Sequence, residues 1–392
     1  MATPITDTAL TPPASGRRLA LIASHAPSLI RFRGRLIQAL LAQGHAVLCA
    51  APDFDEAVEG ELREWGAQTH SIPLSRTGLS PLADLRTLRA LTRLFRQWRP
   101  CTVMGYTAKP AIYASLAASR TGVARIVPMI TGLGYAFLEG GGLKRRLIRQ
   151  IILRLYSRAL AVSTGVIFHN ADDAKVLKDA SVVPASLPVT IVPGSGVDLA
   201  HFARAPLPPL QEGLTFLMIA RLVRYKGVGE YCAAARLLRQ RGVAARCVLV
   251  GPEEDGPAGF PRQHLHDFAD CITYLGPSSD VRPHIAAAHV YVLPSYGEGM
   301  PRTVLEAMAM GRPIITTDAR GCRETVVPGL NGYLVPAGDA DALAAAMCRF
   351  AEEPEQIARM GEASRERAES QFDVARVNAI MLKALGVDSS KA

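Results

Sequence analysis

Two glutamates lie eight residues apart around the start of one expected helix. Glu298 lies in a loop after an apolar run, and Glu306 lies inside a helix expected over about 301–310. Between them, Gly299 and Met300 offer backbone amides near the helix N-terminus, where an anion binds well. The two carboxylates suit two hydroxyl groups of a ligand whose phosphates bind to these amides, which is the outline of a nucleotide-sugar site. From spacing alone, a solvated loop glutamate explains Glu298 equally well.

Two basic residues follow another expected strand. The segment RLVRYKG comes directly after the apolar run at 215–220, so Arg221 and Lys226 lie at the carboxyl end of that strand. Two cations there could hold a diphosphate and stabilise it as it leaves a reacting centre. The alternative is a pair of exposed surface cations, which is the commoner position of arginine and lysine.

A regular alternation of strands and helices positions both groups. Each half of the chain shows short apolar runs separated by helical segments, which predicts parallel sheets with helices on their faces. The fold class we expect is α/β, with two Rossmann-like doubly wound domains. Such folds bind ligands at the carboxyl ends of their strands. No G-x-G-x-x-G motif follows the first strand at 19–23, which argues against a nicotinamide-dependent oxidoreductase.

Composition shifts divide the 392 residues into five segments. A polar start with three prolines is expected to be flexible, and a run rich in Pro and Gly separates the two α/β halves. A last amphipathic segment follows the second half. The predicted boundaries are a tail at 1–16, a first domain at 17–195, a linker at 196–212, a second domain at 213–371 and a terminal helix at 372–392.

The positive charge is concentrated in the first half. Residues 1–200 contain 23 Lys and Arg and 13 Asp and Glu, whereas the remainder contains 21 and 22. A basic half implies an anionic partner, such as nucleic acid, an acidic membrane surface or a phosphate-bearing substrate. The segment 143–160 is a basic amphipathic helix that would suit an anionic membrane. A core-facing helix with a solvated basic face is the alternative explanation.

Other features narrow the class of protein. Seven cysteines are scattered without a C-x-x-C pair, which argues against a zinc or disulfide framework and favours a reducing compartment. We expect neither a membrane-spanning helix nor a signal peptide. The D-x-D pair of Asp53 and Asp55 matches a pattern that binds metal–nucleotide complexes elsewhere. We expect it to be a coincidence, because the pair lies among other acidic residues.

The most specific string in the chain is EGMPR, followed by LEAMAMGRPIITTD and GCRET. It resembles the E-x7-E region of family 4 retaining glycosyltransferases. The resemblance implies the GT-B fold, in which two Rossmann-like domains face a cleft and a C-terminal helix crosses back to the first domain. It also implies that the first domain binds the acceptor and the second binds the nucleotide-sugar donor.

The same resemblance implies roles for individual residues of the second half. GT-B enzymes generally hold the donor diphosphate with cations and helix amides, so no metal cofactor is expected. The implied positions are Arg221 and Lys226 for the diphosphate, Glu306 for the ribose, Glu298 for the donor sugar, Gly299 and Met300 as amide donors, and Leu275 with Gly276 at the base-binding edge.

The first half is similar to a bacterial branch of this family that acts on polyprenyl-diphosphate-linked sugars, including N-acetylhexosamines, in surface polysaccharide and glycan assembly. The similarity rests on FRGRLIQAL, YTAKPAIYASLAA, MITGLGYAF, HNADD and VPGSGVD. It implies the acceptor-side residues Arg31, Arg33, Lys109, Thr131, Gly132 and Asn170.

One departure from the family concerns a histidine. Many members place a catalytic histidine where this chain has Thr131, Gly132 and Leu133. His25 and His169 also follow strands, and we expect each to be structural or to contact substrate. No residue of this chain is therefore an obvious base for the reaction, and the family implies that the leaving phosphate acts as the base.

The resemblance implies transfer of a sugar from a nucleotide donor, expected to be UDP-linked, to a lipid-diphosphate-linked acceptor with retention of configuration. The basic first half then has an anionic membrane as a partner, and we expect a cytoplasmic enzyme peripheral to the inner face. A UDP-sugar 2-epimerase of the same architecture, or a transferase with a soluble acceptor, is the alternative. A nucleic-acid-binding protein would explain the pI of about 9.3. It would not explain the glutamates and the basic pair of the less basic half, so we expect no nucleic-acid partner.

Overall fold

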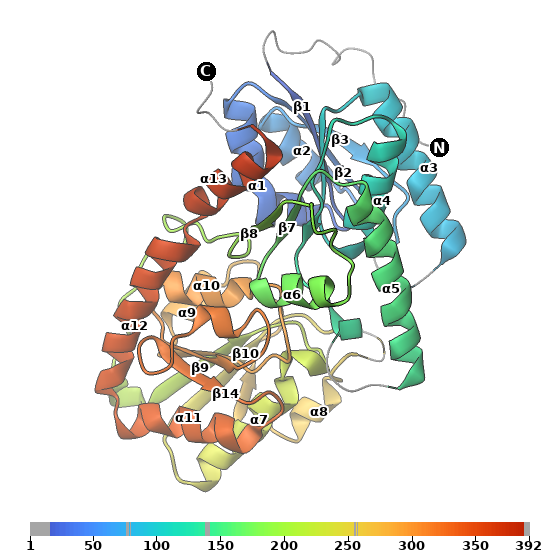
Figure 1. Ribbon diagram of the computed structural model, residues 1–392. Helices are drawn as coiled ribbons and strands as arrows, with labels where there is room; N and C mark the ends of the chain where they lie inside the picture. The colour runs from blue at the N-terminus through green and yellow to red at the C-terminus, as the bar shows by residue number, and fades with distance from the viewer. Residues whose placement is uncertain are drawn as a thin grey trace. The chain divides into compact units, whose positions relative to one another are not determined.

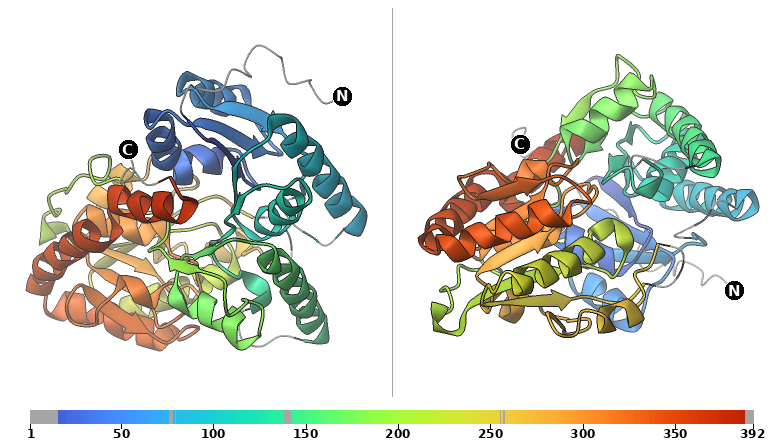
Figure 2. Two further views of the ribbon diagram at one scale, coloured as in Figure 1. Left: turned by 45° about the horizontal axis from the view of Figure 1, so that its top comes forward. Right: turned by 90° about the horizontal axis from the view of Figure 1, so that it is seen from below.

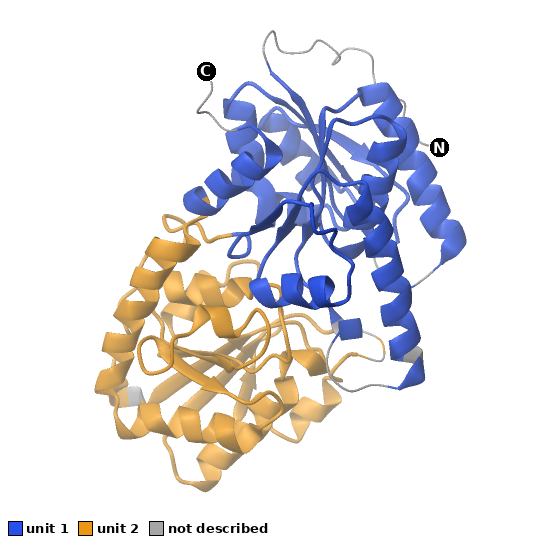
Figure 3. Ribbon diagram, in the orientation of Figure 1, with its two compact units in different colours: residues 1–195, 375–392 blue, residues 196–374 orange. Residues whose placement is uncertain are grey.

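The computed structural model describes residues 16–75, 78, 80–137, 142–254, 256 and 258–387. The chain is an α/β protein with parallel sheets, as the alternation predicts (Figure 1). It divides into unit 1, residues 1–195 with 375–392, and unit 2, residues 196–374 (Figure 3). The tail expected at 1–16 lies outside the described residues, apart from Gly16.

Unit 1 contains a five-stranded parallel sheet and a smaller three-stranded one. The larger sheet has the order β3-β2-β1-β4-β5, so its strand order reverses between β1 and β4. Its strands are β1 (Arg18–Ile22), β2 (Ala46–Ala51), β3 (Gln68–Ser71), β4 (Thr102–Gly105) and β5 (Arg125–Ile126). The smaller sheet consists of β6 (Met129–Ile130), β7 (Val166–Phe168) and β8 (Val189–Ile191).

Helices follow these strands in the usual α/β manner. Helices α3, α4 and α5 lie side by side, as the views in Figures 1 and 2 agree. The helical segments are α1 (Pro27–Ala42), α2 (Glu56–Glu64), α3 (Pro81–Trp98), α4 (Ala108–Arg120), η2 (Tyr135–Phe137), α5 (Leu143–Ala161) and α6 (Ala171–Asp179).

Unit 2 contains a six-stranded parallel sheet with the order β11-β10-β9-β12-β13-β14, which reverses between β9 and β12. The strands are β9 (Leu214–Ile219), β10 (Ala245–Val250), β11 (Ile272–Tyr274), β12 (Val290–Leu293), β13 (Ile314–Thr317) and β14 (Gly332–Val335). The helical segments are η3 (Leu210–Glu212), η4 (Arg224–Lys226), α7 (Val228–Gln240), α8 (Gln263–His266), α9 (Arg282–Ala286), α10 (Arg302–Ala309), η5 (Arg323–Thr325), α11 (Ala340–Glu352), α12 (Glu355–Arg367) and the π-helical turn η6 (Ala368–Phe372).

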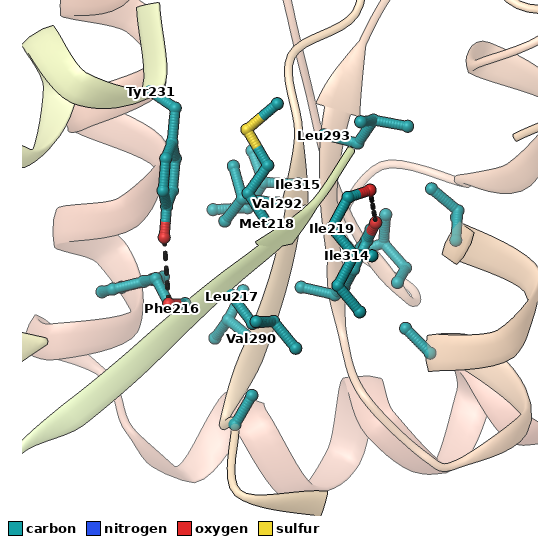
Figure 4. Packing of buried hydrophobic residues seen from close by; sticks show 14 of the residues in the cluster. Phe216, Leu217, Met218, Ile219, Tyr231, Val290, Val292, Leu293, Ile314 and Ile315 are labelled. Carbon is teal, nitrogen blue, oxygen red and sulfur yellow. Dashed lines mark hydrogen bonds between the residues drawn. The ribbon is translucent and has the colours of Figure 1, made fainter. Parts of the chain in front are cut away.

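The central strands of unit 2 are almost entirely buried, as expected of a parallel sheet with helices on both faces. Phe216, Met218, Val290 and Ile315 from three of these strands are buried in one cluster (Figure 4). The Tyr231 hydroxyl donates to the carbonyl oxygen of Phe216 at 2.9 Å, which gives its buried polar tip a partner. This core fixes the strand ends that carry the candidate site.

The last helix, α13 (Val374–Leu385), returns to the first unit, as the fold class predicts. Met381 and Leu385 are fully buried in the cluster formed by β1, β2 and α1. The π-helical turn η6 separates α13 from α12, and such turns commonly redirect a helix. The described residues 375–387 thus contribute to the core of unit 1 and are not an appendage of unit 2.

The segment 196–212, expected as a linker, is packed onto unit 2. Val197 and Phe202 are buried in its core. The buried guanidinium of Arg312 donates to the carbonyl oxygens of Ala205 at 2.9 Å and Pro206 at 2.8 Å. A segment with buried apolar side chains and bound carbonyl groups has a fixed path, so its Pro and Gly content marks a turn-rich strap and not a free linker.

Candidate functional site

The candidate site of unit 2 lies where its strand order reverses. Strands β9 and β12 are neighbours, and the strand order reverses between them. The loops after both strands begin at the carboxyl edge of the sheet, which is the usual ligand-binding position in doubly wound folds. Lys226 follows β9 and Glu298 follows β12. The Lys226 ammonium pairs with Glu298 Oε1, and the two side chains are only 18% and 14% exposed. The fold thus brings together two of the three residues predicted as catalytic.

Neighbouring loops hold Glu298 in place. Its Oε1 accepts from Ser295 Oγ at 2.8 Å, and its backbone amide donates to the carbonyl oxygen of Arg320 at 2.8 Å. The amide of Tyr296 donates to the carbonyl oxygen of Tyr225 at 2.9 Å. The loops after β9, β12 and β13 are therefore bound to one another around the Lys226–Glu298 pair.

Two glycines allow these loops to approach so closely. Gly227 has φ 77°, and a Cβ there would lie 2.1 Å from the carbonyl oxygen of Pro294. Gly321 has φ 74°, and a Cβ there would lie 2.1 Å from the carbonyl oxygen of Glu298. Larger residues would clash and be strained at both places. Sequence reasoning did not single out Ser295, Gly227 or Gly321, although each stands beside a residue that it did predict.

Arg221 lies at the same edge but has other partners. Its guanidinium donates to Glu254 Oε2 at 2.8 Å and to the Tyr225 hydroxyl at 3.0 Å. Burial works to lower the pKa of Arg221, yet the hydrogen bond to Glu254 and the nearby charges outweigh it and leave the pKa raised. Glu254 was missed by sequence reasoning, and the acidic pair that follows strand β10 is the signal that marks it.

Glu306 lies on α10, whose observed bounds match the expected helix within a residue. Its carboxylate is buried and accepts from Arg302 Nε, one helical turn earlier, at 2.7 Å. Burial raises the pKa of Glu306, and the charge and hydrogen bond of Arg302 act in the opposite direction. Carboxylate oxygens accept hydrogen bonds, so Glu306 offers the type of partner that a ligand hydroxyl group requires.

The remaining donor-side residues lie at two places on the sheet edge. Leu275 follows β11 and is 49% exposed, which leaves an apolar side chain on the surface beside Gly276. Gly276 accepts from the amide of Gly251 at 2.8 Å, so the loops after β10 and β11 are joined. Gly299 and Met300 stand between Glu298 and α10, and Met300 packs against the core of unit 2.

Arg33 does not lie in an exposed loop. Helix α1 begins at Pro27, so Arg33 falls two turns inside it and on its buried face. Its guanidinium lies 3.3 Å from His169 Nε2 and 5.1 Å from the centre of the Tyr106 ring. Burial, and next the charge of Arg33, hold the pKa of His169 well below its usual range. Arg33 and His169 are thus interior residues of unit 1, and Arg33 lies within helix α1 and not in the acceptor-side loop where the sequence placed it.

The other acceptor-side residues occupy separate elements of unit 1. Arg31 is exposed on α1, and Thr131 and Gly132 are half-buried after β6. The Lys109 ammonium lies 2.9 Å from Asp84 Oδ1 in a largely buried pair that joins α4 to α3. Asn170 caps α6 by accepting from the amide of Asp173 at 2.7 Å. Lys109 and Asn170 therefore have structural partners in their own unit.

The two aspartates of the D-x-D pair have separate duties. Asp55 caps α2, accepting from the amide of Val58 at 2.8 Å. Asp53 accepts from the amide of Ala26 at 2.7 Å and pairs with Nδ1 of His25. Within the part of the chain that the structure describes, no group of three His, Cys, Asp or Glu side chains could hold a metal ion.

Two doubly wound units, one with a Lys–Glu pair and a buried carboxylate at its strand reversal, define a glycosyltransferase of the GT-B fold. Solved structures show the same fold. Sucrose-phosphate synthase from Thermosynechococcus elongatus superposes with a TM-score of 0.77 at 20% identity, covering 94% of this chain and 98% of that one. Anabaena HepE in complex with UDP gives 0.75 at 18% identity, with 94% and 99% covered.

Residues 213–353 match the family model of the glycosyl transferases group 1, and residues 30–166 match that of a glycosyl transferase 4-like domain. The N,N'-diacetylbacillosaminyl-diphospho-undecaprenol alpha-1,3-N-acetylgalactosaminyltransferase of Campylobacter jejuni is 26% identical, covering 80% of this chain and 84% of the relative. The UDP-Gal:alpha-D-GlcNAc-diphosphoundecaprenol alpha-1,3-galactosyltransferase of Escherichia coli is 25% identical, with 72% and 74% covered. The predicted family, fold and enzyme class are confirmed.

Proposed function

We propose that this glycosyltransferase moves a sugar from a UDP-linked donor to a hydroxyl group of a saccharide carried on polyprenyl diphosphate, with retention of configuration. The Lys226–Glu298 pair at the strand reversal of unit 2 carries the proposal, because it places a cation and a carboxylate at the ligand-binding edge. The activities for which the two relatives described above are named support this acceptor class and, for the second, a UDP donor.

In this proposal Lys226 and Arg221 neutralise the leaving diphosphate. Each cation pairs with a carboxylate, Lys226 with Glu298 and Arg221 with Glu254, and these pairs orient the cations before the donor binds. The phosphates then compete with the two carboxylates for the cations. Charge that develops on the leaving group is stabilised most by donors that need no reorganisation. Glu298, released from Lys226, then accepts from hydroxyl groups of the donor sugar, and Glu306 accepts from the ribose.

The reaction we propose requires no metal cofactor, because two cations are available for the diphosphate. We expect transfer to continue unchanged in the presence of EDTA. A loss of transfer in EDTA that added Mg²⁺ or Mn²⁺ restores would contradict this part of the proposal.

A basic face of unit 1 supports a membrane-bound acceptor. On α3, exposed arginines recur at helical spacing and the one acidic residue, Asp84, is buried against Lys109. These arginines are Arg86, Arg89, Arg93 and Arg96. Helix α5, which packs against α4, adds the exposed Arg146 and Arg149.

Exposed leucines stand at the N-terminal ends of the same two helices. Leu82 on α3 is 73% exposed, and Leu143 on α5 is 82% exposed. None of the helices in the described part of the chain combines the length and apolar character that a membrane crossing requires. Arginines that attract anionic headgroups, with leucines at one end, suit peripheral binding at a cytoplasmic membrane surface.

Transfer of labelled sugar tests the proposal. Purified enzyme is given UDP-Gal, UDP-GalNAc, UDP-Glc or UDP-GlcNAc with GlcNAc-diphospho-undecaprenol, and lipid-soluble label is counted. We expect label from at least one donor and its loss in Lys226→Met. Conversion of the donor sugar without any acceptor would favour the 2-epimerase alternative, and transfer to free saccharides alone would favour a soluble acceptor.

A further inference from the structure

A histidine–aspartate pair stands at the strand reversal of unit 1. The five-stranded sheet reverses between β1 and β4, and this edge is the usual ligand-binding position of a doubly wound unit. His25 follows β1 and Asp53 follows β2. Nδ1 of His25 pairs with Oδ2 of Asp53, and the two side chains are 39% and 43% exposed. The pair is thus accessible at the ligand-binding edge of its own unit.

Several residues that were expected to contact the acceptor are less accessible than this pair. Arg33 and Asn170 are each only 2% exposed. The ammonium of Lys109 is paired with a carboxylate of α3, and its side chain is 13% exposed. His25 and Asp53, by contrast, combine a position at the strand reversal with exposure. They are therefore better placed in unit 1 to meet a ligand.

The loop that carries His25 is bound to loops on both sides. On the β2 side, Oδ1 of Asp53 accepts from the amide of Ala26 at 2.7 Å. On the β4 side, the Thr107 hydroxyl donates to Ser24 Oγ at 2.9 Å and makes no cap for α4. Thr107 has φ 68°, an unusual value for a β-branched residue that is kept most often at functional sites. The imidazole therefore stands on a loop that is positioned before any ligand binds.

Asp53 determines which ring nitrogen of His25 carries the proton. Burial works to raise the pKa of Asp53, but the hydrogen bonds from His25 and from the amide of Ala26 outweigh it, so the pKa is lowered and the carboxylate stays ionised. An ionised carboxylate requires a donor at Nδ1, which leaves Nε2 of a neutral imidazole as an acceptor. The pair therefore offers two kinds of hydrogen-bond acceptor to a ligand.

This combination favours one class of ligand. An ionised carboxylate repels phosphate, so the pair does not suit the diphosphate of a lipid-linked acceptor. A metal site usually has at least three protein ligands, and no such group of His, Cys, Asp or Glu occurs among the described residues. Hydroxyl groups donate hydrogen bonds, and bonds to an ionised acceptor are the stronger ones. A saccharide, which offers several hydroxyl groups in a fixed arrangement, is the ligand that fits.

We propose that His25 and Asp53 recognise hydroxyl groups of the acceptor saccharide and thereby determine which saccharide is accepted. The acceptor saccharide is taken from the transferase function proposed above, on which this inference rests. The recognition involves residues of unit 1 only. It assigns no base, so the leaving phosphate keeps that role.

The alternative is that the pair only fixes the start of α1. Asp53 does bind the amide of Ala26 at that helix N-terminus. His25→Ala removes the imidazole and leaves this bond in place. Asp53→Asn keeps an oxygen that accepts from Ala26 but removes the charge that a saccharide hydroxyl group would meet. A structural role would lower the thermal unfolding temperature of these variants, whereas a recognition role would lower their affinity for one particular hydroxyl group.

The test measures the binding of GlcNAc-diphospho-farnesol and of its 3-deoxy, 4-deoxy and 6-deoxy forms to the full chain, by titration calorimetry without donor. In wild type we expect at least one deoxy probe to bind about tenfold more weakly than the parent probe, because it lacks one hydrogen bond. The parent probe should bind about tenfold more weakly to His25→Ala or Asp53→Asn. In the variant that lacks the partner of that hydroxyl group, the deoxy and parent probes should bind equally, which is the non-additivity of a direct contact.

A matched control is His45→Ala. His45 lies in the same unit just before β2, hence at the opposite, amino edge of the sheet, and its Nδ1 accepts from the amide of Arg17 at 3.2 Å. It should bind all four probes as wild type does. The thermal unfolding temperatures of His25→Ala and Asp53→Asn should stay near that of wild type.

Three outcomes would overturn the assignment. These are wild type that binds all four probes equally or none of them, variants that bind the parent probe as wild type does, and deoxy effects that persist unchanged in both variants. Transfer of sugar is measured separately. Wild type that transfers sugar without these binding differences defeats the saccharide site alone, whereas wild type that shows them and transfers nothing defeats the proposed function alone.

Discussion

The ammonium group of Lys226 pairs with the carboxylate of Glu298, so a donor phosphate must compete with this carboxylate to bind Lys226. Both side chains are mostly buried, so their attraction is screened less than that of a surface pair. The two residues therefore act on nucleotide binding in opposite directions. Lys226 favours the diphosphate, whereas Glu298 disfavours it until its own hydrogen bonds are made to the sugar.

Substitution Glu298→Gln should separate binding from transfer. The change removes the negative charge from Lys226, so we expect UDP to bind about tenfold more tightly, a gain of about 1.4 kcal/mol. Transfer should nevertheless fall about 10²-fold, because the hydroxyl groups of the donor sugar then meet a neutral amide instead of a carboxylate. Titration calorimetry with UDP measures the first effect, and the lipid-labelling assay measures the second. Weaker UDP binding in Glu298→Gln would show that the ion pair serves only to hold the loops together.

The ionised carboxylate of Glu306 should lower the free energy of unfolding by an amount that depends on pH. Burial raises its pKa, so the folded state binds a proton more tightly than the unfolded state does. The stability that follows from this proton is present at low pH and is lost as pH rises through the raised pKa. Glu306→Gln carries no charge, so we expect it to unfold at a higher urea concentration than wild type at pH 7 and at the same concentration below about pH 4.

The same substitution should cost activity. Transfer by Glu306→Gln is expected to fall about 10²-fold at pH 7, since a ribose hydroxyl then meets an amide. The lipid-labelling assay measures this loss of transfer. Urea unfolding followed by circular dichroism at pH 7 and below about pH 4 measures the change in stability. A variant less stable than wild type at pH 7 would mean that the Arg302 partner dominates over burial.

At the scale of the element, close contact between the loops after β9 and β12 depends on Gly227. We expect Gly227→Ala to lower the free energy of unfolding by about 3 kcal/mol, because it combines left-handed strain with a clash at Pro294. Gly242 has a similar φ of 71° with no atom within 4 Å of a Cβ, so Gly242→Ala should cost only the strain of about 1 kcal/mol. Urea unfolding measures both. Equal losses in the two variants would remove the argument from loop contact.

The arginines of α3 give a second prediction at this scale. Replacing Arg89 and Arg93 with glutamine should weaken flotation with anionic liposomes several-fold at low salt, at roughly 1 kcal/mol for each charge. The exposed Arg246 and Arg359 of unit 2 provide a matched loss of two charges that should leave flotation unchanged. UDP binding is expected to be normal in both variants. Equal effects of the two double variants would make the attraction one of net charge and not of this face.

Elements were the part of the molecule that the sequence predicted best. Strands of a parallel sheet are apolar along their length, so runs such as 290–293 and 314–317 stand out, and the helix between them has Pro301 and Gly311 at its ends. The positions of Lys226 and Glu298 after strands were predicted from the sequence, whereas their direct pairing was not. What could not be predicted depends on helix phase and on packing. Arg33 lies on the buried face of α1, and 196–212 is held by Arg312, which lies more than a hundred residues away.

At the scale of the whole molecule, the chain divides into two units, and we expect their stabilities to be measurable separately. Residues 375–392 belong to unit 1, so its core contains both ends of the described chain, whereas the candidate donor site belongs to unit 2. A ligand stabilises the folded state that binds it. Nucleotide should therefore act on one unit, and a core substitution in α13 should act on the other.

Calorimetry tests this division. We expect two unfolding transitions, of which saturating UDP raises only one, by several degrees. Met381→Ala, which removes a fully buried side chain of α13, should lower the other transition by an amount equivalent to about 2–5 kcal/mol. Met347→Ala, an equally buried change in the core of unit 2, should instead lower the transition that UDP raises. If UDP and Met381→Ala moved the same transition, the return of α13 would couple the two units into one cooperative structure, and binding energy at the donor site would then stabilise the core of unit 1 as well.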